Sequence, residues 1–74
     1  MTYEQCKEKA LKINPDFNAC KEYKTAYHFY NKNDENIRES DNDVVILKET
    51  GKILNLSTFI LNYLPERTPK EKTF

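Results

Sequence analysis

The chain has a single glycine, Gly51, and it lies shortly after the longest apolar run, Val44–Leu47. Four apolar residues bounded by turn-forming residues are typical of a buried strand. A three-residue hairpin loop needs a left-handed residue at its third position, and glycine adopts that conformation without steric cost. The sequence therefore predicts a tight hairpin, in which residues 44–48 form a buried central strand and pair with residues 52–54.

Two segments have the periodicity of amphipathic helices. Over residues 3–13, apolar side chains recur at helical spacing, and Thr2 with Gln5 has the form of a capping box. A second apolar stripe ends at Pro65, which cannot continue a helix. The residues of this second stripe are Leu56, Phe59, Ile60, Tyr63 and Leu64. We expect Phe59 and Ile60 to be buried against a sheet.

A third segment, residues 20–31, has the alternation of a β-strand. Its more apolar face is assigned to the core, and His28 and Tyr30 lie on the other face. The core face consists of Tyr23, Thr25, Tyr27 and Phe29. Beyond the second helix, residues 65–74 are polar and are expected to form a flexible tail.

The order of these elements predicts the fold class. It is α+β, with the order α-β-β-β-α in two layers. The simplest closure is a three-stranded antiparallel meander with both helices on one face, which leaves the other face open. Residues 1–64 form a single small domain in this interpretation, followed by the tail.

Composition limits which cellular compartments and which classes of partner we expect. Twelve Lys and Arg balance twelve Asp and Glu, and zero net charge argues against generic binding to nucleic acid or acidic membranes. No apolar run approaches the roughly 18 residues of a membrane span, and no signal peptide is visible. Cys6 and Cys20 match neither a disulfide framework nor a zinc motif. We expect a cytoplasmic protein with free thiols and no metal or cofactor, and the AT-rich codon bias of the composition suggests a bacterial source.

One surface is a candidate for partner binding. It combines the outward strand face, His28 and Tyr30, with an acidic segment that has no calcium-loop spacing. The acidic residues are Asp34, Glu35, Glu39, Asp41 and Asp43. Such a surface suits a basic partner protein. The alternatives are a solvated loop, a half-exposed surface histidine and a Tyr30 that only covers its own sheet.

Two stretches together resemble small bacterial immunity-type domains. The first is Ala26-Tyr27-His28-Phe29-Tyr30, and the second is Val44-Val45-Ile46-Leu47-Lys48-Glu49-Thr50-Gly51-Lys52-Ile53. In those domains a helix precedes an aromatic W-x-F-like strand and a V-V-D-K-x-T-G-x-V-like hairpin. The resemblance covers residues 20–54, although this chain has no Trp and has Leu47 where an acid is frequent. It implies a single-domain antidote that binds a toxin.

No nucleophile stands at a recognisable spacing from a base, so we expect no enzyme activity. The expected function is that of a small non-catalytic protein-binding module, either immunity-type or an accessory protein of a phage or mobile element. The alternative is a nucleic-acid-associated accessory domain that uses the aromatic strand 27–30. The oligomeric state is left open.

Overall fold

The computed structural model describes residues 1–32 and 43–74, and it has an α+β architecture. Its sheet has five strands in the order β4-β3-β2-β1-β5, and every neighbouring pair is antiparallel. The elements in chain order are α1 (Tyr3–Ile13), β1 (Ala19–Glu22), β2 (Ala26–Tyr30), β3 (Val44–Leu47), β4 (Ile53–Leu54), α2 (Leu56–Tyr63) and β5 (Lys70–Lys72). The α+β class is confirmed, and the predicted three-stranded meander is only part of the sheet.

Helix α1 begins and ends where the sequence predicts. The Thr2 hydroxyl accepts a hydrogen bond from the Gln5 backbone N–H at 3.2 Å, and the Gln5 side chain accepts one from the Thr2 N–H at 3.0 Å. This reciprocal pair satisfies two backbone donors that a helix start leaves unpaired. At the other end, Asn14 has an extended backbone, which the following Pro15 favours.

The hairpin around Gly51 is confirmed, with a loop one residue longer than predicted. Gly51 has a φ of 74°, in the left-handed region. Its N–H donates to the Leu47 carbonyl at 2.8 Å, while the Leu47 N–H donates to the Lys52 carbonyl at 3.0 Å. The loop therefore contains residues 48–51, and β3 pairs with β4 through Val45 with Leu54 and Ile46 with Ile53.

The predicted single strand over residues 20–31 is wrong, because the chain turns back within it. The Tyr23 N–H donates to the Ala26 carbonyl at 2.8 Å, which closes a tight turn between β1 and β2. This turn contains neither glycine nor proline, and the alternation of aromatic residues continues across it, so the pattern gave no sign of it. As a result Tyr23 packs with Phe59, whereas Tyr27 and Phe29 belong to a separate cluster.

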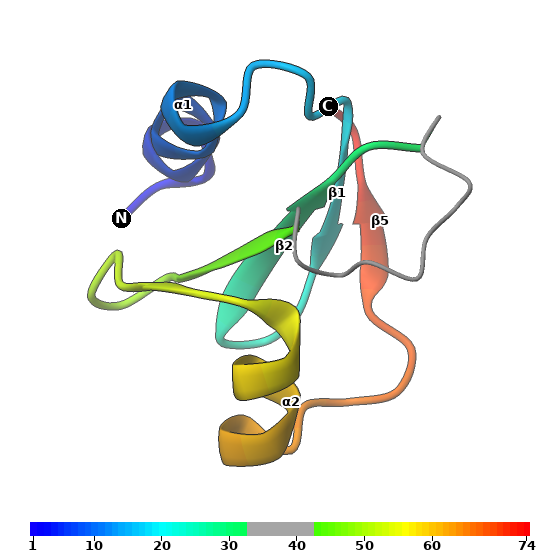
Figure 1. Ribbon diagram of the computed structural model, residues 1–74. Coiled ribbons are helices and arrows are strands. Elements are labelled where there is room, and N and C mark those ends of the chain that lie inside the picture. The colour runs from blue at the N-terminus through cyan, green and yellow to red at the C-terminus, as the bar shows by residue number, and fades with distance from the viewer. Residues whose placement is uncertain (33–42) are drawn as a thin grey trace.

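The helices cover opposite faces of the sheet, not one face as predicted (Figure 1). Ile46 belongs to the buried cluster that includes Cys6 and Ala10 of α1. Its neighbour Val45 belongs to the cluster that includes Phe59 of α2. Successive residues of a strand point to opposite faces, so each cluster lies on its own side. The continuous apolar run of β3 reflects burial on both faces.

Residues 65–74, predicted to be a flexible tail, contain a strand. β5 pairs with β1, so that Lys72 lies opposite Cys20 and Lys70 lies opposite Glu22. Beyond β5, the Phe74 ring meets the Phe29 ring edge-on, with 6.3 Å between their centroids. The polar composition did not indicate this strand, because backbone hydrogen bonds to β1 need no apolar side chain.

Both cysteines are fully buried free thiols, as expected for Cys6 and Cys20. They lie in the cluster between α1 and the sheet. Burial is the main reason that the pKa of Cys20 is raised to about 12. Neither helix in the described part of the chain is long and apolar enough to cross a membrane.

Thiol titration tests this burial. In native protein, both thiols should react slowly with a disulfide reagent, because the thiolate is the reactive form and burial disfavours it. Under denaturing, non-reducing conditions, the titration should count two thiols per chain. A count of zero with an unchanged monomer mass would mean that a disulfide joins Cys6 to Cys20, contrary to the structure.

Candidate functional site

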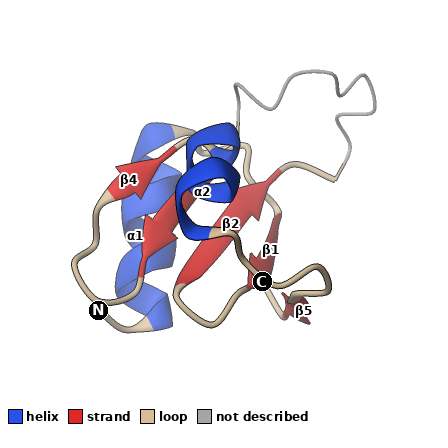
Figure 2. Cartoon of the chain, turned by 90° about the horizontal axis from the view of Figure 1, so that it is seen from below, coloured by secondary structure: helices blue, strands red, loops and turns tan. Residues whose placement is uncertain are grey.

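The predicted open face of the sheet is wrong, because α2 covers part of it, and a smaller surface is left at one end of the sheet. Lys21 lies opposite both His28 of β2 and Glu71 of β5, and Tyr30 lies two residues beyond His28, so all four side chains share one face. This is the face on which α2 packs, but α2 contacts β3 and lies away from β5 (Figure 2). We call Lys21, Tyr30, Lys32 and Glu71 the Tyr30 surface.

His28 is buried beneath this surface, so its expected half-exposed position is wrong. Its exposed fraction is 7%, and its Nε2 lies 3.0 Å from the Asp43 carboxylate. Its Nδ1 is buried and has no hydrogen-bond partner among the described residues. Burial lowers the pKa of His28, although the Asp43 carboxylate acts in the opposite direction. The lowered pKa favours the neutral ring at pH 7. Neither ring nitrogen is open to a ligand.

The burial of His28 predicts a pH dependence of stability. Its pKa is lowered in the folded state, so as the pH falls below about 6.5 the unfolded state binds the proton first. The free energy of unfolding should therefore fall between pH 7 and pH 5, by at most about 1.4 kcal/mol per pH unit. Urea denaturation at pH 7, 6 and 5 measures this slope.

His28 is the only histidine in the chain, so a His28→Gln variant isolates its contribution. That variant should have a flatter pH dependence than wild type over the same range. Measurements stay at pH 5 or above because carboxylates titrate lower, near pH 4. An identical slope in both proteins would contradict the assignment.

The Tyr30 ring is held from several sides. It stacks on the His28 ring, with 5.2 Å between centroids and 27° between planes. The Lys21 ammonium lies 5.5 Å from the centroid of the Tyr30 ring. The Tyr30 hydroxyl donates a 3.5 Å hydrogen bond to Glu71, which also pairs with Lys32 at 3.3 Å. Burial raises the pKa of Tyr30, with Glu71 adding to the effect, so its hydroxyl stays protonated.

The acidic part of the predicted site falls mostly outside the described residues. Asp34, Glu35, Glu39 and Asp41 all lie in residues 33–42, so their place in the site stays a prediction. Asp43 immediately precedes β3, and its carboxylate contacts His28. The structure thus brings together three of the predicted residues, His28, Tyr30 and Asp43.

The aromatic strand 27–30 does not form a stacking platform. Tyr27 and Phe29 point to the α1 face, where their exposed fractions are 7% and 0%. With His28 also buried, Tyr30 is the one ring of these four residues that lies partly in solvent. A base-stacking surface needs several exposed rings beside a basic groove.

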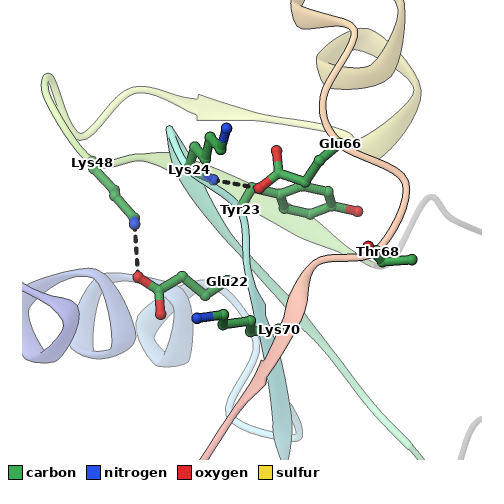
Figure 3. Close-up of a pocket in the computed structure, with 7 residues that line it drawn as sticks. All are labelled: Glu22, Tyr23, Lys24, Lys48, Glu66, Thr68 and Lys70. Atoms are coloured by element: carbon green, nitrogen blue, oxygen red, sulfur yellow. Dashed lines mark hydrogen bonds and ion pairs between the residues drawn. The ribbon is translucent and has the colours of Figure 1, made fainter.

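A pocket of about 500 Å³ lies where β1 turns into β2, and the sequence analysis missed it (Figure 3). The Glu22 carboxylate accepts a 2.7 Å hydrogen bond from Lys48, which is the main reason that the pKa of Glu22 is lowered. The lining residues are Glu22, Tyr23, Lys24, Lys48, Glu66, Thr68 and Lys70. No sequence pattern pointed to it, because the pairing of β5 with β1 brings Lys70 opposite Glu22.

The outer side of α2 is the most apolar exposed part of the described chain. Phe59 is fully buried as predicted, but Ile60 is 45% exposed, so its predicted burial is wrong. Leu61 is 77% exposed and Leu64 is 80% exposed. The α2 apolar face consists of Ile60, Leu61, Tyr63 and Leu64. Because α2 has only eight residues and meets the sheet through Phe59 and the partly buried Leu56, the other apolar residues of this segment stay largely exposed in the described chain.

Within residues 1–32 and 43–74, no group of three or more His, Cys, Asp or Glu side chains could hold a metal ion. No family model, curated protein or solved structure matches this chain. The site is therefore interpreted from its own geometry.

Proposed function

We propose that the chain is a small non-catalytic module that binds a basic partner protein through the Tyr30 surface. The observation that carries this proposal is the fixed position of the Tyr30 ring. The ring stacks on His28 and bonds to Glu71, yet part of it lies in solvent. Tyrosine is enriched at binding hot spots, and a ring that is already fixed loses little entropy on binding.

The buried histidine beneath the ring supports this interpretation. A buried ring nitrogen without a partner costs free energy, and such groups in a native structure call for an explanation. Here the His28 ring is held by Asp43 and forms the base on which Tyr30 rests. The cost is consistent with selection for a rigid tyrosine at this position.

The acidic sequence that follows Lys32, rather than the charge of the Tyr30 surface itself, supports a basic partner. Residues 33–42 connect Lys32 to Asp43 in the sequence. In sequence they carry four acidic residues against Arg38 alone. A local negative charge attracts a basic protein and raises its association rate. The resemblance to immunity-type domains suggests a toxin as the partner, and a phage or mobile-element protein is the other class.

Affinity capture from the source cell, with crosslinking, identifies the partner. The dissociation constant of the purified pair is then measured. Tyr30→Ala should raise the dissociation constant by about 30-fold or more, since hot-spot truncations cost about 2 kcal/mol or more. Tyr63→Ala is the matched control, because Tyr63 is a 46% exposed tyrosine on α2. Equal binding by folded Tyr30→Ala and wild type would overturn the proposal.

A charge variant shows whether the acidic segment raises the association rate or holds the bound partner. Asp34→Asn combined with Asp41→Asn leaves the Asp43–His28 contact intact. This variant should lower mainly the association rate, and added salt should remove the difference from wild type. An unchanged association rate at low salt would rule out a role for the acidic segment in attracting the partner.

A further inference from the structure

We infer that the α2 apolar face binds the same face of a second copy of the chain, forming a two-fold dimer. The first argument is exposure. Leu61 and Leu64 leave about four-fifths of their surface in solvent, and Ile60 and Tyr63 nearly half. An apolar patch gathered on one short helix marks an interaction site more often than scattered exposed residues do.

The second argument is the absence of charge, which identifies the occupant. Residues 53–65 contain no charged side chain, although charged residues make up 32% of the chain. Residues 53–65 themselves offer no ion pair to a strongly basic or acidic partner, and an anionic membrane attracts helices that carry Lys or Arg. A second copy brings an equally uncharged face, so no like charges meet across the two-fold axis.

The third argument is that the face carries both parts of a self-complementary contact. A groove of about 530 Å³ runs beside α2 and is lined by Ile60, Leu64 and Pro65 together with Tyr23, Glu66 and Arg67. Leu61 does not line this groove, but it follows Ile60 in sequence and is 77% exposed. In a two-fold pair, Leu61 of each copy can enter the groove of the other. The rim has one negative and one positive residue, so Glu66 of one copy can face Arg67 of the other.

The backbone of Leu64 adds a fourth observation. Leu64 caps α2 in the left-handed conformation, with a φ of 43°, where glycine or asparagine is usual. A leucine is disfavoured in that conformation, and the Leu64 side chain is 80% exposed. A strained apolar residue directed into solvent is consistent with a contact residue.

Sedimentation equilibrium of the full chain, between about 5 and 500 µM, tests the dimer. The face is built on one short helix, which suits a small and weak interface, so we expect a dissociation constant on the order of 10–100 µM. The average mass should rise with concentration from 8.8 kDa toward twice that value. A constant monomer mass over the whole range would overturn the inference.

Two variants and a control locate the interface. Leu61→Ser should weaken association by about 10-fold or more. Leu64→Gly should do the same while leaving the fold at least as stable, because glycine relieves the left-handed strain. Ile13→Ser is the control, since Ile13 is 48% exposed on α1, and it should dimerise like wild type. Wild-type association by both α2 variants would overturn the inference.

Vesicle flotation tests whether the α2 apolar face binds lipid instead of a second copy of the chain. Flotation of wild type, but not Leu61→Ser, with neutral or anionic vesicles would show that lipid takes this face and would overturn the inference. The dimer is independent of the proposed function, because Tyr30 lies outside the α2 apolar face. A monomeric Leu61→Ser protein should bind the basic partner like wild type, so each proposal can fail alone.

Discussion

Replacing Phe59 with alanine should lower the free energy of unfolding by about 3–5 kcal/mol. Phe59 is fully buried, and it is the residue through which α2 packs on the sheet. Its ring meets the Tyr23 ring at 5.1 Å in an edge-on arrangement and packs against Val45 and Leu47. Alanine would leave a cavity between the helix and the sheet. Urea denaturation followed by circular dichroism measures the loss.

This loss is a large share of the roughly 5–15 kcal/mol that stabilises a typical domain, so Phe59→Ala risks failing to fold. Phe59→Leu keeps most of the volume and should cost about 1–2 kcal/mol. Leu61→Ala in the same helix is the control, and its effect should stay within about 0.5 kcal/mol because Leu61 is 77% exposed. Comparable losses for Leu61→Ala and Phe59→Ala would contradict the packing of α2.

Replacing Gly51 with valine should lower the free energy of unfolding by about 1–2 kcal/mol or more. The left-handed φ of 74° disfavours any side chain with a Cβ, and a β-branched one most. A Cβ at this position would also collide with the Met1 sulfur and approach the Lys9 ammonium to 3.3 Å. Thermal unfolding measures this, and each kcal/mol corresponds to about 4–8 °C in a domain of this size.

Gly51→Asn is the matched variant for this turn. Asparagine has the same Cβ but tolerates the left-handed region better than valine does. The difference between the two variants isolates the backbone strain, and their shared loss reports the contact with Met1. A melting temperature that is unchanged in Gly51→Val would mean that this turn does not constrain the hairpin.

The candidate site could be predicted only in part from the sequence. Alternation placed His28 and Tyr30 on one face of a strand, and the structure agrees. It could not show that His28 is buried or that Asp43, fifteen residues away, contacts its ring, because both depend on tertiary packing. Lys21 and Glu71 could not be linked to Tyr30, because they reach it through the pairings of β1 with β2 and of β1 with β5.

Local chemistry determined the parts of the fold that depend on neighbouring residues. The Thr2–Gln5 capping box set the start of α1, and Gly51 set the hairpin, because each depends on contacts within a few residues. The apolar run of β3 indicated burial, and the apolar stripe indicated α2. These features follow from backbone propensity and side-chain spacing, which a linear pattern contains.

Only the tertiary structure decided how these parts assemble. Burial of Val45 and Ile46 on opposite faces requires a helix on each side of the sheet, which the sequence pattern of either helix does not specify. The turn between Tyr23 and Ala26 and the pairing of β5 depend on backbone hydrogen bonds, which side-chain patterns do not encode. The exposure of Ile60 was also decided by the tertiary structure. A periodic stripe shows which side of a helix is apolar, but it does not show how much of that side the sheet covers.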